Sequence, residues 1–256
     1  MKRLNRHIVS LQSRTFLVLV MLACLLTVLS GCMYPGGQEQ TNTRSYRESV
    51  DRVQRALDQF QTDTGILPII TAGPETPRYE KYRIDMIQMH DKGYLEEIPS
   101  AAFEQGGSVY FLVLNEEVDP TVKVMDLLTV QKVNDVQRMV DSYRSKHDGA
   151  SPVQDGPQAY PGLYMVDLKL AGAQNYKVSS VFSGQEQPFL VDDEGVVYLD
   201  YGFDIMQVID KSQLDTKADQ EKDLREYLTD HSYYVPVKSL PYRWQDGAPV
   251  AMATGK

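Results

Sequence analysis

The stretch VQRALDQF, residues 53–60, returns with few changes as VQRMVDSY, residues 136–143. Both stretches begin Val-Gln-Arg and keep an aspartate at the sixth position and an aromatic residue at the eighth. Each belongs to a longer run with apolar residues at 3-4-3 spacing, which is typical of the buried face of an amphipathic helix. These positions are Val50, Val53, Leu57 and Phe60 in the first run, and Val133, Val136, Val140 and Tyr143 in the second. The sequence therefore predicts two related helices.

The sequence after each helix also repeats. A glycine-containing break leads to Pro68-Ile69 in the first copy and to Pro152-Val153 in the second, and glycine and proline both end helices. YRID at 82–85 then corresponds to YMVD at 164–167. In each copy two β-prone runs flank a turn, which indicates a β-hairpin; the runs are 108–114 with 121–127, and 188–191 with 196–201. We expect an α+β fold with two tandem helix–loop–helix–β-hairpin units.

A third, partial copy closes the sequence. Leu224, Tyr227 and Leu228 lie on one face of a short predicted helix that precedes Pro236. Because the period near 84 residues is too long for a solenoid repeat, it favours duplicated α+β units. The predicted boundaries are 45–128 for the first unit, 129–212 for the second, and 213–256 for a C-terminal helix and tail that packs back on the second unit.

Residues 1–31 have the features of an export signal. Lys2, Arg3, Arg6 and Arg14 precede the uncharged run 16–29. This run is shorter than the roughly 20 residues of a membrane-spanning helix. It ends in a sequence that resembles a bacterial lipobox, in which the cysteine receives a diacylglycerol and becomes the first residue of the mature protein; the lipobox residues are Leu29, Ser30, Gly31 and Cys32. The alternative is an uncleaved anchor with a chance cysteine.

Lipidation at Cys32 would place the protein on the extracytoplasmic face of the cell membrane, because two acyl chains together anchor a protein stably. Residues 32–44 are mostly polar, with proline and glycine, so we expect a flexible tether. Cys24 would leave with the signal, which would leave one cysteine and no intrachain disulfide. Removing the signal would also shift the net charge from −9 to about −13, which argues against a nucleic-acid partner.

We predict no catalytic residues, no metal site and no cofactor apart from the diacylglycerol on Cys32. The sequence contains neither the GxSxG motif of serine hydrolases nor a P-loop. His90, His147 and His231 are isolated, and the last two occupy corresponding helix ends, where the helix dipole favours histidine. The run DDEG at 192–195 lacks EF-hand spacing and indicates a turn, with weak Ca²⁺ binding as the alternative.

The aromatic residues near the C-terminus are the candidate binding residues: Tyr233, Tyr234, Tyr242 and Trp244. Tyrosine and tryptophan are favoured in protein interfaces. The alternative is that these rings pack on the core and expose only their polar groups.

Two resemblances add to this interpretation. The run from ALDQFQTDTGILPI to YLEEIPSAAFEQGGSVYFLV resembles, weakly, the soluble part of type II pseudopilins, which has a long helix followed by a small hairpin sheet. The segments LSGCMYP, ILPI, TPRYEKYRID, AAFEQGG, DPTVK and VYLDYGFDI are similar to YphF-type lipoproteins of Bacillus-like bacteria. This second resemblance covers most of the mature chain. It implies location and family, extends the expected partners to the spore envelope, and implies no active site.

The sequence as a whole favours a membrane-anchored, non-enzymatic lipoprotein that binds another protein of the cell envelope, through its sheet faces or its C-terminal aromatic residues. The alternative is a lipid-anchored binding protein that delivers a small solute or glycan to a transporter. An enzyme is the third hypothesis.

Overall fold

The computed structural model describes residues 37–214 and 222–253. The lipobox, Cys32 and the first residues of the expected tether lie outside the described residues. Tyr46–Lys256 form one compact unit. Of the preceding segment, residues 37–45 are described, as the first turns of a helix. None of the described helices combines the length and the apolar character that crossing a membrane requires.

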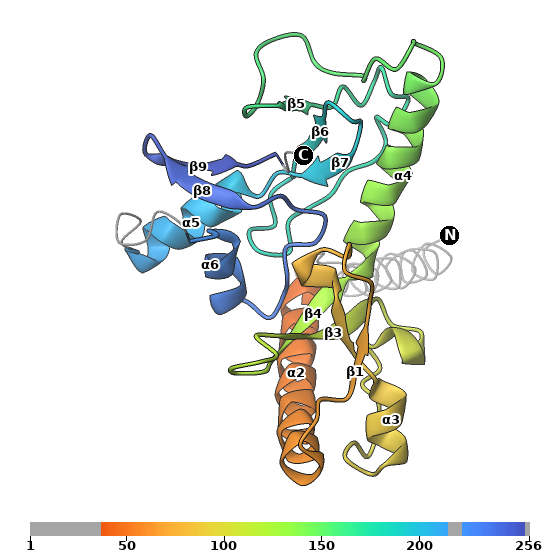
Figure 1. The fold of residues 1–256 in the computed structure, drawn as a ribbon, viewed down its shortest axis with the longest axis vertical. Coiled ribbons are helices and arrows are strands. Elements are labelled where there is room, and N and C mark those ends of the chain that lie inside the picture. The colour runs from red at the N-terminus through yellow and green to blue at the C-terminus, as the bar shows by residue number, and fades with distance from the viewer. Residues whose placement is uncertain (1–36, 215–221, 254–256) are drawn as a thin grey trace, which may run out of the picture. The chain divides into compact units, whose positions relative to one another are not determined.

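The fold is α+β, as predicted (Figure 1). In chain order the first repeat contains α2 (Gly37–Thr64), β1 (Ile69–Thr71), η2 (Arg78–Glu80), β2 (Tyr82–Ile84), α3 (Met86–Asp91), η3 (Phe103–Gln105), β3 (Val109–Leu114) and β4 (Thr121–Asp126). The second repeat contains α4 (Leu127–Arg144), β5 (Leu163–Met165), β6 (Phe189–Asp192) and β7 (Val197–Leu199). The C-terminal part contains α5 (Gly202–Ser212), α6 (Arg225–Asp230), β8 (Tyr242–Gln245) and β9 (Ala248–Ala251).

The first repeat is an antiparallel sheet of order β1-β2-β3-β4 with α2 against one face. The apolar face predicted for α2 is buried there, as Val50, Val53, Leu57 and Phe60 pack with Phe111, Val113, Val122 and Val124. The predicted hairpin is β3 and β4, which pair from Val109–Asp126 to Leu114–Thr121. Nearly every residue of β3 is buried, so both faces of this strand are covered.

The second repeat has the same plan in a smaller form. Its sheet has the order β5-β6-β7, and α4 packs beside β7 (Figure 1). A single antiparallel bridge between Val153 and Val166 stands where β1 pairs with β2 in the first repeat. The loop contact is the same in both copies, because the Asp85 N–H donates to the Pro68 carbonyl at 2.8 Å and the Asp167 N–H donates to the Pro152 carbonyl at 2.8 Å. Turns at 168–172 replace the short helix α3.

The structure differs from the prediction at two boundaries. The helix α2 begins at Gly37, so residues 37–44 are helical where a flexible tether was expected, since glutamine, glutamate and arginine extend a nucleated helix readily. The helix α4 begins at Leu127, two residues before the expected boundary, because the Asp126 carboxylate accepts the Thr129 N–H directly after β4. The repeats therefore join without a linker and belong to one compact unit.

The C-terminal part is more ordered than the predicted helix and tail. The sequence did not predict α5, and residues 242–251 form the hairpin β8–β9. Asp246 and Gly247 at its tip both have positive φ, at 50° and 85°. This geometry is that of a type I′ turn, for which Asp-Gly is a strong signal.

Residues 233–238, here called the closing segment, cover an edge strand in each repeat. In the first repeat the Val124 N–H donates to the Tyr233 carbonyl at 2.8 Å, and the Val235 N–H donates back to the Val124 carbonyl at 3.1 Å. In the second repeat the Leu199 N–H donates to the Lys238 carbonyl at 2.9 Å. The C-terminal part thus packs on both repeats, rather than on the second repeat alone as expected.

Candidate interaction surface

The predicted C-terminal aromatic residues do not form a shared exposed platform. Tyr242 is completely buried, and its hydroxyl donates to Asp200 Oδ1 at 2.8 Å and accepts the Tyr201 N–H at 2.8 Å. Burial and the Asp200 carboxylate raise the pKa of Tyr242 well above its ordinary value. Trp244 packs partly buried against the core of the second repeat. The prediction that Tyr242 contacts a partner is therefore wrong.

Tyr233 and Tyr234 lie against the core of the first repeat. The Tyr233 hydroxyl accepts a hydrogen bond from Arg47 Nε at 2.7 Å, and the Tyr234 ring meets the Tyr46 ring edge-on at 5.9 Å. Burial raises the pKa of the Tyr234 hydroxyl. Tyr233, Tyr234 and Trp244 pack partly buried against the cores of the two repeats, as the alternative proposed, and Tyr242 is buried completely.

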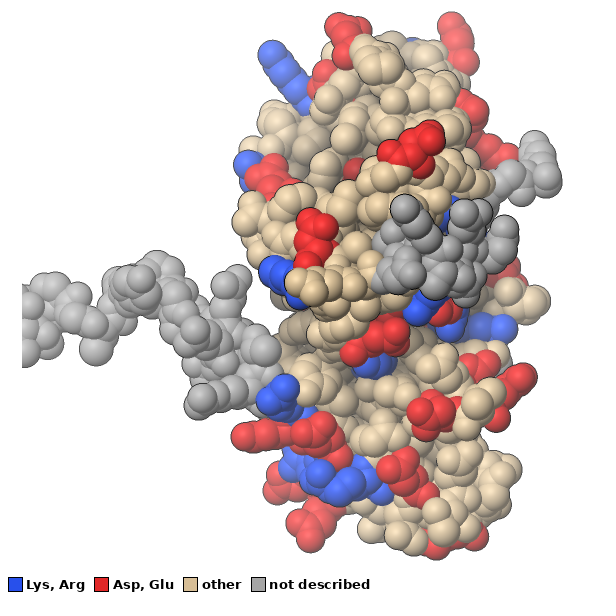
Figure 2. Space-filling model, turned by 90° about the vertical axis from the view of Figure 1, so that its left-hand side faces the viewer, with Lys and Arg blue, Asp and Glu red and all other residues tan. Residues whose placement is uncertain are grey.

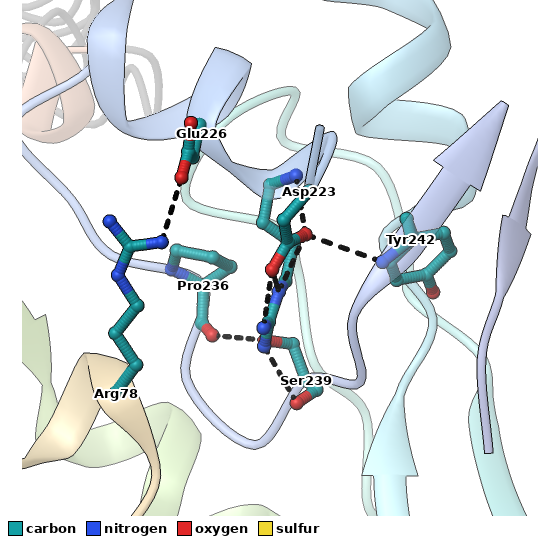
Figure 3. A network of polar contacts seen from close by, with 7 residues as sticks. Arg78, Asp223, Glu226, Pro236, Ser239 and Tyr242 are labelled. Atoms are coloured by element: carbon teal, nitrogen blue, oxygen red, sulfur yellow. Dashed lines mark hydrogen bonds and ion pairs between the residues drawn. The ribbon is translucent and has the colours of Figure 1, made fainter. Parts of the chain in front are cut away.

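A largely buried ion pair lies at the start of α6 (Figure 3). The Arg225 guanidinium binds the Asp223 carboxylate through Nε and Nη2, the latter at 2.7 Å, and its Nη1 donates to the carbonyl and hydroxyl of Ser239 at 3.1 and 3.0 Å. Burial acts to raise the pKa of Asp223, but the hydrogen bonds and charge of Arg225 outweigh it and hold this pKa below its ordinary value. The group clamps the loop between α6 and β8.

Tyr79 links the ion pair of Arg225 and Asp223 to the first repeat. Its ring lies 4.9 Å from the Arg225 guanidinium and packs with Leu112, Leu114 and Val235. Burial raises the pKa of Tyr79 to about 12, and no described residue hydrogen-bonds its hydroxyl. Beside it, Arg78 Nη1 of η2 donates to Glu226 Oε1 of α6 at 2.8 Å (Figure 3). These contacts are structural, since they join α6 to the first repeat.

An aromatic and cationic strip remains uncovered on the outer face of the first sheet. The Phe103 and Tyr110 rings lie 5.0 Å apart, and the Arg83 guanidinium lies 4.7 Å from the Tyr110 ring. Ile70 pairs with Arg83 across β1 and β2 and extends the strip. Phe103 is 53% exposed and Ile70 is 44% exposed. We call these four residues the outer strip.

The outer strip has unused binding capacity. Within residues 37–214 and 222–253, Arg83 has no carboxylate at ion-pair distance. Its guanidinium lies against the Tyr110 ring, and arginine beside aromatic residues is a combination enriched in protein interfaces. On the same face, Leu112 and Leu114 are covered by Tyr79 and the closing segment. The outer strip is thus the part of this face that the closing segment leaves uncovered.

A cavity of about 690 Å³ lies at the end of the same sheet. It is lined by Thr76, Arg78, Lys81, Tyr82, Leu114 and the hairpin loop 115–119. We call it the hairpin-end cavity. A second cavity of about 560 Å³ lies in the other repeat, between the loop around Asp167 and the start of β6.

The face shown in Figure 2 has no large patch of a single charge sign. Acidic and basic side chains are interspersed there over both repeats (Figure 2).

The histidines and the acidic turn occupy structural positions. His147 Nδ1 lies 2.8 Å from the Tyr143 carbonyl and His231 Nδ1 lies 2.9 Å from the Tyr227 carbonyl, so both cover equivalent helix ends, as predicted. Asp192 Oδ1 accepts the Val196 N–H at 2.8 Å within the β6–β7 turn. The described residues contain no group of three or more potential metal ligands.

Asp204 is a buried carboxylate whose hydrogen bonding is incomplete among the described residues. This aspartate of α5 is 2% exposed, and Gln187 donates to its Oδ2 at 3.2 Å, while no residue that the structure describes hydrogen-bonds its Oδ1. Burial raises the pKa of Asp204, because it removes the charged carboxylate from solvent. The carboxylate lies inside the second repeat.

Neither the outer strip nor the hairpin-end cavity was predicted from the sequence. The run 108–114 predicted one strand of a hairpin, but which part of the outer face stays open depends on where the closing segment lies. A signal for the strip existed in Arg83, a cation placed between apolar residues of β2.

The comparisons with known proteins concern the first repeat. No curated protein and no solved structure matches the chain. The matched region begins with the part of α2 in the compact unit and ends with the last residue of β4. Residues 46–126 match the model of the YphF family N-terminal domain, and this match supports a YphF-type family for the chain.

Proposed function

We propose that this protein is a lipoprotein anchored through Cys32 on the extracytoplasmic face of the membrane, where it works as a non-enzymatic interaction module of the cell envelope. The lipobox pattern at 29–32 supports the anchor. The outer strip is the observation that supports the interaction role, because it places two aromatic rings beside a guanidinium that has no carboxylate partner among the described residues.

The strip defines the partner's chemistry. Phe103 and Ile70 offer apolar contact, and Arg83 offers donors for a carboxylate. A complementary surface would present an apolar side chain next to an aspartate or glutamate, so that the desolvated guanidinium is paired rather than left without a counter-charge. The strip lies in the region that matches the YphF family N-terminal domain.

The anchor is tested by mass spectrometry of the N-terminal peptide from membrane-extracted protein. We expect a peptide that begins at Cys32 and carries diacylglycerol, and we expect the Cys32→Ala variant to leave the membrane fraction. A peptide that retains residues 1–31 in the native protein would contradict the anchor.

The second candidate function is ligand capture for a transporter, and one observation favours it. The hairpin-end cavity, at about 690 Å³, falls in the roughly 300–1,000 Å³ range of small-molecule sites. A ligand that co-purifies with the chain and occupies this cavity would favour capture over docking.

A further inference from the structure

We propose that the hairpin-end cavity binds a short peptide or peptide-like molecule that carries both a free ammonium group and a free carboxylate. This inference goes beyond the docking role proposed above and does not depend on it. The cavity has the size of a small-molecule site, and its walls carry charges of opposite sign.

One wall is cationic. Arg78 Nη1 is held by Glu226 at 2.8 Å and Nη2 lies 3.4 Å from Asn115 Oδ1, so the guanidinium has a fixed orientation. Lys81 lies on the same wall, with its ammonium 5.1 Å from the Tyr82 ring. No carboxylate in the described part of the chain pairs with Lys81. Because Glu226 already balances Arg78, Lys81 is the cation available to a ligand carboxylate.

The hairpin loop contributes the anionic part of the lining. Glu116, Glu117 and Asp119 belong to the loop between β3 and β4, and none of them pairs with a basic residue that the structure describes. The Asn115 carbonyl accepts the N–H groups of Val118 and Asp119 at 3.1 and 3.0 Å, so the loop has a defined conformation. These carboxylates would attract an ammonium group.

The rest of the lining suits a peptide. Tyr82, which is partly buried, lines the cavity and offers the face of its ring to small side chains. A ligand with one charge would satisfy one wall and leave the other unpaired, whereas a dipolar ligand matches both. The cavity should therefore select ligands that carry both charged end groups, whatever their side chains.

Trialanine is the probe, with N-acetyl-trialanine and trialanine amide as matched controls that each lack one charged end. Binding to the full chain in detergent micelles is measured by ligand-observed NMR titration. We expect trialanine to bind and each capped peptide to bind at least about tenfold more weakly. Lys81→Gln should weaken trialanine binding to the level of the amide and leave binding of the amide unchanged, and Lys132→Gln, an exposed lysine outside the cavity, should change neither.

Two results would overturn the inference. The first is the absence of trialanine binding to the unsubstituted chain at concentrations up to about 10 mM. The second is equal binding of all three peptides. Both are read on the unsubstituted protein, so neither depends on the folding of a variant, and both leave the docking role of the outer strip to its own test.

Discussion

Gln54 of α2 and Gln137 of α4 make the same three hydrogen bonds in the two repeats. Each side-chain amide donates to the aspartate one turn later in its own helix and to a carbonyl of the hairpin turn. Each side-chain carbonyl accepts an N–H from the second hairpin strand. The distances are 2.8 Å to Asp58, 2.9 Å to Pro120 and 2.7 Å to Val122 for Gln54, and 2.9 Å to Asp141, 2.7 Å to Gly195 and 2.7 Å to Val197 for Gln137. The glutamine and aspartate shared by the two helices therefore hold helix to hairpin.

Replacing Gln54 with methionine should destabilise the protein by about 1–3 kcal/mol, because it leaves the part-buried Pro120 carbonyl and Val122 N–H without partners. Gln59→Met is the matched control, since Gln59 makes the same bond to an aspartate one turn later, at 2.8 Å, and is exposed. Denaturant unfolding measures both. If Gln54→Met loses no more unfolding free energy than Gln59→Met, the helix-to-hairpin hydrogen bonds contribute nothing to stability.

Val235→Pro should open the edges of both sheets together. The substitution removes the N–H that binds the Val124 carbonyl, while the closing segment also covers Leu199 in the second repeat. We expect faster hydrogen exchange at the Val124 and Leu199 amides, because each loses its partner when the segment detaches. Val235→Ala keeps the N–H and serves as the control for lost packing. Acceleration at Val124 with an unchanged Leu199 would mean that the segment does not act as one element.

Arg225→Met should cost about 3–5 kcal/mol, whereas Arg78→Met should cost about 1 kcal/mol or less. Both arginines pair with a carboxylate, but the Arg225 side chain is 9% exposed and the Arg78 side chain is 47% exposed. Removing Arg225 leaves the Asp223 carboxylate in a site of low solvent access, so the pair of variants separates burial from charge. Thermal unfolding of the two at one pH gives the comparison. Equal losses would contradict the assignment of Arg225 as the buried clamp.

Asp204→Asn should stabilise the protein at neutral pH by about 1 kcal/mol. Burial raises the pKa of Asp204 in the folded state above its unfolded value of about 4. A raised carboxyl pKa means that stability is greatest below the unfolded pKa and is lost as pH rises through the folded pKa. The free energy of unfolding, measured from about pH 4 to pH 8, should therefore fall more for the native chain than for the variant. Parallel pH profiles would show that ionisation of Asp204 does not destabilise the folded protein.

The periodic and repeated parts of the chain were predictable, and the elements made by long-range contact were not. The 3-4-3 spacing from Val50 to Phe60 identified α2, and the turn residues between 108–114 and 121–127 identified the β3–β4 hairpin. The register of the repeat then placed His147 and His231 at equivalent helix ends. These features are local, so the sequence encodes them directly.

The prediction that Tyr242 contacts a partner was wrong because its burial depends on long-range contacts. Nothing local in the sequence shows that residues 233–238 reach the edges of two sheets, or that Tyr242 finds Asp200. Asp246-Gly247 did carry a hairpin signal, which the aromatic content of the segment obscured. The outer strip depends on the same long-range packing, since its limits are set by where the closing segment lies.

The docking role is tested most directly by site-specific photocrosslinking in intact cells, with the photoreactive residue at Phe103 of the anchored protein. Phe203 of α5, which is 57% exposed against 53% for Phe103, is the matched control position. The proposed function predicts one discrete protein adduct from position 103, lost in the Arg83→Ala variant, and none from position 203. Adducts of equal yield at both positions, or no protein adduct at position 103, would contradict the outer strip as a docking surface.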